Sequence, residues 1–249
     1  MSNRQKKALF CVCGALSFAC VLGAAVAVGS PQWVKGSILC HTGAELVNAT
    51  DSELEQFVGR VAYGLFHGQR LRQCGLGGRP LRFSFFPDLM GVIPMGLHVS
   101  VLLFCALLVV FSSVTSAFCL YNAFGSPYET LHGPLGLYLW NLISCETRVP
   151  EGDAYPEFCA AGLCGSLAMI LFASEVKVHR LSEKIANFNE RSFVYKTQAE
   201  QFDRSFWIIL FVFLTHAVNI LLVRLAGIQF PFQEAKEPEL STGASDLMY

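Results

Sequence analysis

Residues 133–173 decide the fold, and they read GPLGLYLWNLIS (133–144), CETRVPEGDAYPEF (145–158) and CAAGLCGSLAMILFA (159–173). The two outer blocks are apolar. As helices they reach about 18 and 22 Å, short of a hydrocarbon core about 30 Å thick. Joined end to end, they are long enough for one membrane crossing. The pattern therefore predicts one transmembrane helix over 133–174, interrupted by a polar insert at 145–158.

The insert carries five charged side chains. It cannot remain in the middle of the bilayer, because each such side chain costs about 2.5–3.5 kcal/mol there. One solution slides the crossing to about 158–174, which keeps four crossings and leaves 133–144 at the cytoplasmic interface. In the alternative arrangement, the third crossing fails, and the last loop and the tail move to the opposite sides of the membrane. A glycosylation site engineered near Asn187 would be used only if four crossings survive.

The composition is that of an integral membrane protein. Of 249 residues, 53% are hydrophobic and 15% charged, and the mean hydropathy is +0.46, whereas soluble domains have about 25% charged residues. A net charge of −1 gives no basic field for nucleic acid. Phosphate-binding loops, nucleophile elbows and zinc-ligand spacings are missing from the sequence. The chain is therefore predicted to be no enzyme and to hold no cofactor or metal.

Three other segments are long enough to span the membrane, at 8–28, 96–121 and 206–224. The first follows Arg4, Lys6 and Lys7, so it is predicted to be a signal anchor with a cytoplasmic N-terminus. Its apolar run exceeds the usual core of a cleaved signal peptide. Residues 29–95 and 175–205 then become extracellular loops, and 233–249 becomes a disordered cytoplasmic tail.

Small and polar side chains inside the spans predict how the helices pack. In the first span, every fourth residue from 15 to 27 is small, which predicts a face for close helix contact (Ala15, Ala19, Gly23 and Ala27). Ser112 and Ser116 give similar spacing in the second span. His216 and Asn219 lie on one face of the last span, and an interhelical hydrogen bond is favoured over a proton relay.

The first loop carries two modification signals. Asn48 begins the Asn-Ala-Thr sequon, which topology places in the lumen and which predicts glycosylation. Cys40 and Cys74 are the two cysteines of this loop, and an oxidising compartment favours a disulfide between them. Weaker signals lie on the cytoplasmic side. Cys11 and Cys13 are palmitoylation candidates, and the C-terminal Leu247, Met248 and Tyr249 are similar to a PDZ-domain ligand.

Local patterns predict some structure in the loops. Ser52 and Glu55 form a capping box, and apolar residues at helical spacing follow, which predicts an amphipathic helix at about 53–62. The stretch RPLRFSFFPDLMGVIP (79–94) is either a strand or an aromatic anchor at the membrane surface. The mixed charges of 175–205 predict a solvated helix or loop.

Several stretches resemble the clarin family, among them ILCHTGAELVNAT (38–50), QCGLGGRPLRFSFFPDL (73–89), YNAFGSPYETLHGPLGLYLW (121–140) and MILFASEVK (169–177). The resemblance implies a four-pass plasma-membrane glycoprotein of sensory hair cells and photoreceptors, with both termini cytoplasmic. It also implies roles in hair bundles, ribbon synapses and actin-linked membrane organisation. The implied partners are membrane lipids, scaffold proteins and further copies of the chain.

A more distant resemblance to claudins implies a mainly α fold, a four-helix bundle under a small extracellular β-sheet. Trp33, the run Gly64-Leu65-Phe66 and the pair Cys40 and Cys74 occupy comparable places. The clarin resemblance stops at 145–158, which suggests the hypothesis of an alternatively included exon. If no transcript lacks these residues, that hypothesis is wrong.

The sequence suggests three alternative functions. The first is a non-enzymatic membrane organiser, which the small-residue faces favour. The second is a claudin-like pore former or an auxiliary subunit of an ion channel, which needs a polar pore lining. The third is an intramembrane enzyme using Cys105 or Cys119 with His216, and buried structural cysteines are far commoner than reactive ones.

Overall fold

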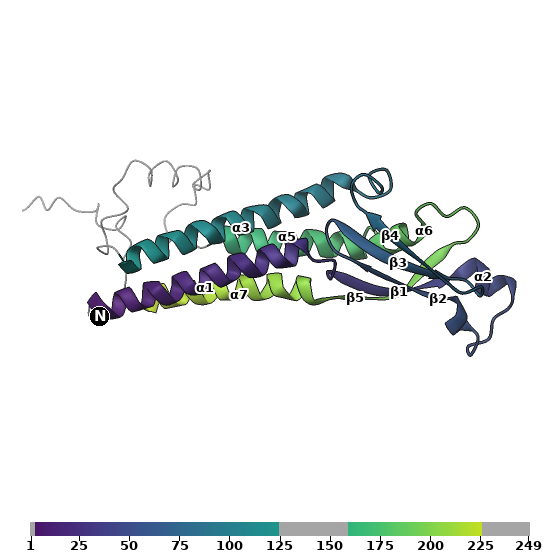
Figure 1. The fold of residues 1–249 in the computed structure, drawn as a ribbon, viewed down its shortest axis with the longest axis horizontal. Helices are drawn as coiled ribbons and strands as arrows, with labels where there is room; N and C mark the ends of the chain where they lie inside the picture. Colours follow the sequence, from purple (N-terminus) through teal and green to yellow (C-terminus); the bar gives the residue numbers. More distant parts are fainter. Residues whose placement is uncertain (1–2, 125–158, 226–249) are drawn as a thin grey trace, which may run out of the picture.

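The computed structural model describes residues 3–124 and 159–225. Four long helices lie side by side, and a sheet caps one end of them (Figure 1). The helices are α1 (Asn3–Gly29), α3 (Met95–Phe124), α5 (Cys159–Lys177) and α7 (Arg204–Leu225). Each of α1 and α5 packs against both α3 and α7. This is the predicted four-helix bundle, and 133–158 lies outside the described residues.

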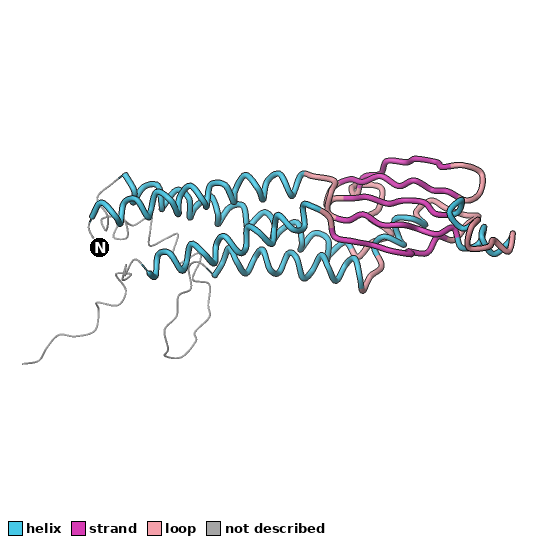
Figure 2. Tube along the Cα trace, turned by 90° about the horizontal axis from the view of Figure 1, so that it is seen from below, coloured by secondary structure: helices cyan, strands magenta, loops and turns pink. Residues whose placement is uncertain are grey.

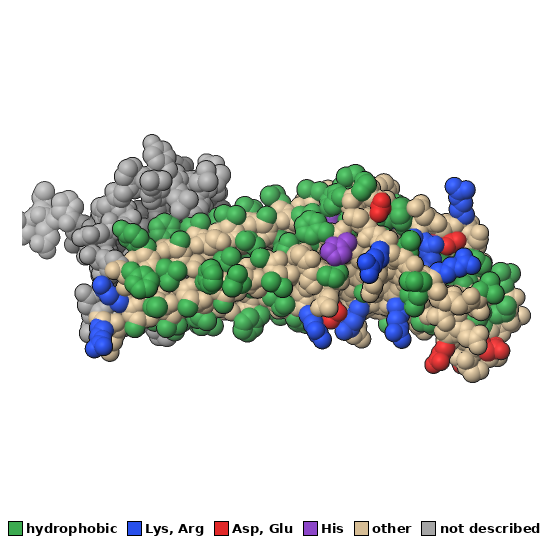
Figure 3. Space-filling model, in the orientation of Figure 1, with side chains coloured by type: hydrophobic (Ala, Val, Ile, Leu, Met, Phe, Trp, Pro, Cys, Tyr) green, Lys and Arg blue, Asp and Glu red, His purple; other side chains and the backbone are tan. Residues whose placement is uncertain are grey.

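The lengths and composition of these helices suit a bilayer. Stretches of α1, α3 and α7 are each long and apolar enough to cross, and α5 with the bent α6 (Leu181–Asn187) makes a fourth candidate. Hydrophobic side chains spread along the bundle, whereas charged ones gather beside the sheet and near the N-terminus (Figure 3). Exposed residues such as Phe18, Leu103 and Phe211 would contact lipid.

The packing face of α1 agrees with the predicted one only in part, because Ala27 is buried as predicted but other predicted residues are not. Ala15 and Ala19 are exposed, and the buried stripe consists of Cys13, Ser17, Cys20, Ala24 and Ala27. The prediction followed residue size alone, but the face is chosen by where α3 and α7 lie. Close approach still depends on a small residue, because a Cβ on Gly14 would lie 3.0 Å from the Leu120 side chain.

At one end of the helices lies a five-stranded antiparallel sheet (Figure 2). Its strands are β1 (Val34–Cys40), β2 (Val58–Tyr63), β3 (His67–Gln73), β4 (Gly78–Ser84) and β5 (Tyr195–Phe202), in the order β4-β3-β2-β1-β5. β5 pairs with β1 from Val34↔Phe202 to Cys40↔Tyr195. The two loops therefore lie at one end of the bundle, as four crossings require.

Two loop predictions need correction, and for a third stretch the structure decides between two alternatives. The helix at about 53–62 is wrong, because η1, a 3-10 helix (Leu54–Phe57), gives way to β2. The apolar spacing fitted a helix, but alternate residues from Phe57 to Tyr63 also point inward as in a strand. The cap forms two residues earlier than predicted, where the backbone N–H and hydroxyl of Thr50 each donate to Glu53 at 3.0 Å.

The aromatic stretch follows one of its two predicted alternatives, whereas the prediction for the second loop needs correction. Of the two alternatives for 79–94, the strand is right for its first part, since Phe83 in β4 is buried against the core. The prediction of a solvated helix or loop over 175–205 is wrong at two places. Glu175 is completely buried, and 195–202 form the strand β5. Because β5 is an edge strand with half of its side chains exposed, its polar sequence resembled a loop.

One layer of aromatic and aliphatic residues joins the sheet to the bundle. The Trp33 indole donates to the Ala27 carbonyl at 2.7 Å and its ring lies 4.9 Å from that of Phe172. The Tyr63 hydroxyl bonds the Ser182 hydroxyl of α6 at 2.9 Å. Burial raises the pKa of Tyr63. The inner face of the sheet is thus covered by α6 and the end of α5.

Candidate functional site: the extracellular sheet and its attachment to the bundle

A completely buried ionisable pair joins two helices to the sheet. His98, near the start of α3, places its Nδ1 3.0 Å from both carboxylate oxygens of Glu175, near the end of α5. The other ring nitrogen lies 2.8 Å from the Leu65 carbonyl, in the turn between β2 and β3. The Phe85 ring stacks on the imidazole at 4.5 Å. These contacts fix the position of the sheet relative to α3 and α5.

The sequence contained a partial signal for this pair. A carboxylate close to the end of an apolar segment needs a partner, because an isolated buried charge is strongly unfavourable. Glu175 was instead counted with the mixed charges of the following loop. His98 lies 77 positions away in the sequence, and only the packing of α3 on α5 brings the two together.

Inside the bundle, serines hydrogen-bond the polar side chains of α7. Ser112 Oγ lies 2.8 Å from His216 Nε2, and the Asn219 amide donates to Ser17 Oγ at 3.1 Å. The Ser116 hydroxyl donates to the Gly14 carbonyl at 3.1 Å. The preferred interpretation of His216 and Asn219, interhelical hydrogen bonding, is confirmed. The partner of His216 is a serine of α3, not one of the cysteines that an intramembrane enzyme would use.

Two arginines of β3 hold the C-terminal end of α6. Arg70 is 1% exposed, and its Nη1 donates to the carbonyls of Ile185 and Ala186. Arg72 donates to the Phe188 carbonyl and to Glu190, the latter at 2.6 Å. The last carbonyls of a helix lack partners within it and carry partial negative charge, so cations stabilise them. Burial lowers the pKa of Arg70 to about 10, and the charge of Arg72 acts in the same direction.

The membrane-distal end contains the predicted modification residues of the first loop. Cys40 and Cys74 form a disulfide that joins the end of β1 to the segment after β3. Gly43 packs beside it, where a Cβ would lie 2.3 Å from the Cys74 sulfur. Asn48 is exposed, with a φ of 50°, in the turn after α2 (His41–Leu46). Its side chain is therefore accessible for glycosylation.

The cytoplasmic candidates differ from one another. Cys11 is exposed on α1, whereas Cys13 is completely buried beside Cys119. Of these two candidates, only Cys11 has an accessible thiol. Leu247, Met248 and Tyr249 lie outside the described residues. Within 3–124 and 159–225, no group of three or more His, Cys, Asp or Glu residues could hold a metal ion.

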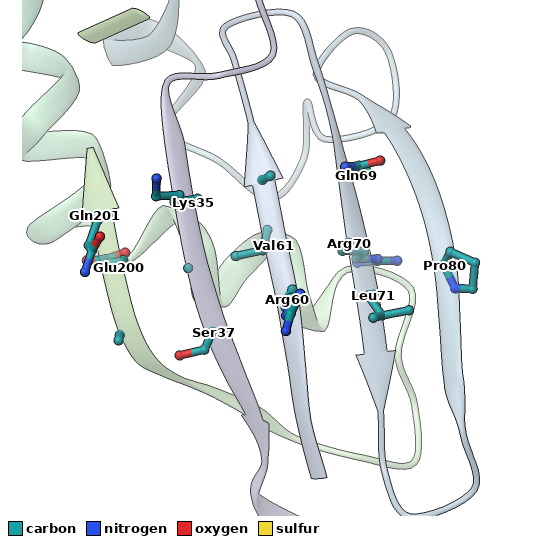
Figure 4. Close-up of a pocket in the computed structure, with 13 residues that line it drawn as sticks. Lys35, Ser37, Arg60, Val61, Gln69, Arg70, Leu71, Pro80, Glu200 and Gln201 are labelled. Carbon is teal, nitrogen blue, oxygen red and sulfur yellow. The ribbon is translucent and has the colours of Figure 1, made fainter. Parts of the chain in front are cut away.

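The outer face of the sheet is hollowed, a feature that the sequence did not predict. A cavity of about 600 Å³ opens there, with residues of all five strands around it (Figure 4). Strand register places one row of side chains across it, from Ala199 through Ser37, Arg60 and Leu71 to Pro80. The neighbouring row runs from Gln201 through Lys35, Ala62 and Gln69 to Arg82.

Comparison with known proteins gives matches over nearly the whole chain. A family model described as Clarin-2-like matches residues 5–223. Clarin-1 of Homo sapiens is 55% identical over 249 residues, with all of both chains covered, and Clarin-1 of Mus musculus is 56% identical over the same length and coverage. Clarin-2 of Mus musculus is 38% identical over 244 residues, covering 98% of each chain.

Proposed function

The chain belongs to the clarin family of multi-pass membrane proteins, and we propose that it organises the plasma membrane by protein–protein contact rather than by catalysis. The observation that carries this proposal is the 55% identity to Clarin-1, which extends over the full length of both chains. Clarins are not known as enzymes. The match to the family includes the residues of both the bundle and the sheet. We therefore assign the function that this chain would share with other clarins to both parts.

The architecture supports a role in which the extracellular part and the membrane part act as one body. The buried contact between His98 and Glu175 and the Trp33 layer leave little freedom between sheet and bundle. A partner bound outside would therefore restrain the orientation of the helices in the membrane. Exposed apolar side chains along the bundle, among them Phe18 and Leu103, offer lateral contacts to lipids and membrane proteins.

We infer that the site of action is the plasma membrane of sensory hair cells and photoreceptors. There the protein would maintain hair bundles and ribbon synapses, and so hearing, balance and vision. The resemblance to the family is the support for this inference. In the same proposal, Leu247–Tyr249 engage a PDZ-domain scaffold linked to actin, Asn48 carries a glycan, and Cys11 is the palmitoylation candidate.

The proposal is tested in hair cells that lack the endogenous protein. Re-expression of the full chain should restore hair-bundle cohesion in micrographs, and deletion of the last three residues should weaken that rescue if scaffold binding matters. A second measurement separates organisation from conduction. Liposomes that contain the purified chain alone should show no more ion flux than empty liposomes. Flux that scales with protein content would favour the pore-forming alternative and contradict the proposal.

A further inference from the structure

We propose that the hollow on the outer face of the sheet docks an acidic, extended polypeptide segment of an extracellular partner. This inference deepens the proposed function and rests on it in one respect, because it supplies the external contact through which membrane organisation would act. Three features carry it, namely the shape of the hollow, the charge of its rim and the character of its floor.

The shape follows from residue size along the two rows. Ala199, Ser37 and Ala62 have short side chains. Across the strands, Ser37 lies opposite the long Arg60, and Ala62 lies opposite the long Lys35. Figure 4 shows Lys35, Ser37, Arg60 and Leu71 on three adjacent strands at the hollow. α6 covers the opposite face of the sheet, but no described residue packs over this hollow, which remains open to solvent.

The outward positions of the described strands carry only positive charge, and Asp203, which follows β5, pairs with one of these cations. In the described strands, the outward positions include Lys35, Arg60, Arg82 and Lys196 but no aspartate or glutamate. Glu200 also borders the hollow, but its carboxylate binds Ser182 and Lys177 on the other face of the sheet.

The cations on this face differ in what they already bind. Lys35 contacts Asp203 at 3.2 Å and remains 55% exposed, whereas no described residue forms an ion pair with Arg60 or Arg82. These two guanidiniums are therefore available to bidentate contact with a carboxylate.

The floor favours a peptide over a sulfated glycan. Leu71, Pro80, Ala62 and Ala199 present apolar atoms to the cavity, which suit the aliphatic parts of amino-acid side chains. A sulfated chain would need more unpaired cations, since its affinity comes mainly from charge. The guanidinium of Arg60 lines the hollow, and that of Arg82 lies beside it, next to the lining residue Gln69. Beside an apolar floor, these two groups instead match one or two carboxylates within a mixed sequence. Asn48 lies outside both rows, so a glycan there would not need to enter the hollow.

The experiment uses the full-length protein in nanodiscs of neutral lipid and a displayed library of random peptides. Clones that bind the wild type should be enriched in Asp and Glu, and their affinity should fall as salt is raised. They should bind the Arg60→Glu/Arg82→Glu variant at least about tenfold more weakly, because each reversal turns an attraction into a repulsion. Arg60→Lys/Arg82→Lys should retain partial binding.

The matched control is Lys184→Glu/Arg191→Glu, which makes the same charge change on the α6 side of the sheet. This variant should bind the selected peptides as the wild type does. Both charge variants should keep the wild-type Tm, which shows that they fold. A heparin-derived oligosaccharide serves as the competing probe in the same assay.

Several outcomes would overturn the inference. These are a failure to enrich any clone, selected peptides without an acidic bias, and equal loss of binding in both charge variants. Arginine-dependent binding of the oligosaccharide without any acidic peptide would identify the ligand as a glycan, which also contradicts the proposal. Because no cellular phenotype enters this assay, its failure would leave the hair-cell rescue and the proposed function to be judged separately.

Discussion

The buried contact between His98 and Glu175 makes a quantitative prediction about stability. Both side chains are 0% exposed, and removal of one partner from such a pair typically costs about 3–5 kcal/mol, because the other is left buried without compensation. We therefore expect Glu175→Leu to lower the stability of the chain by about that amount. At roughly 2–4 °C per kcal/mol, this corresponds to a decrease in Tm of about 6–20 °C.

A double-mutant cycle isolates the pair itself. His98→Leu alone should be similarly costly, but His98→Leu/Glu175→Leu should cost only about 1–3 kcal/mol, because the main remaining penalty is the unpaired carbonyl of Leu65. The control is Lys177→Leu in the same helix. Lys177 binds Glu200 at 2.9 Å and is 51% exposed, and loss of an exposed pair should cost at most about 1 kcal/mol.

Thermal unfolding in nanodiscs can be followed with a dye that becomes fluorescent on reaction with thiols. Cys20 and Cys105 are free and buried, so they react when the bundle opens. The result that would refute the reasoning is additivity, in which the double variant loses as much as the two single variants together. The two residues would then contribute independently, and the proposed coupling of helices and sheet through this pair would be incorrect.

Three further predictions follow from single contacts. Gly64→Ala should destabilise by about 1–3 kcal/mol or more, because the added Cβ would lie 2.1 Å from a backbone carbonyl oxygen, whereas Gly91→Ala, with nothing within 4 Å, should be nearly neutral in the same unfolding assay. Cys74→Ala opens a loop with a sequence separation of 34 and should cost about 4 kcal/mol; surface delivery measured by flow cytometry should fall accordingly. Arg191→Thr creates a sequon in the exposed turn before β5, and it should acquire an endoglycosidase-sensitive mobility shift; an unmodified chain would contradict the luminal position of that turn.

Much of the membrane part could be predicted from the sequence. The spans at 96–121 and 206–224 agree with α3 and α7 to within a few residues, because long charge-free apolar segments have few other stable arrangements in a bilayer. Helix rotation was not predictable in this way. The exposed Ala15 and the buried Ser17 both lie in α1, and residue size alone could not say which of them faces α3.

The extracellular part was less predictable from local patterns. Phe57 and Val61 fitted both a helix and a strand. β5 resembled a solvated loop, because half of the side chains of this edge strand are exposed. Apart from the strand offered as one alternative for 79–94, the sheet was anticipated through the resemblance to claudins. The hollow on its outer face depends on strand register, since Ser37, Arg60 and Leu71 become neighbours only when three strands align.

The sequence by itself determined that the chain is a membrane protein with long apolar helices and an oxidisable first loop, because hydropathy and segment length act locally along the chain. Only the tertiary structure placed 159–173, the second apolar block of the interrupted segment at 133–174, among the other long helices. α5 (Cys159–Lys177) takes its place in the bundle, and the pairing of β5 with β1 sets the end at which the second loop lies. The same holds for His98 and Glu175, whose contact spans 77 positions. Their partnership arises from packing, which no local pattern encodes.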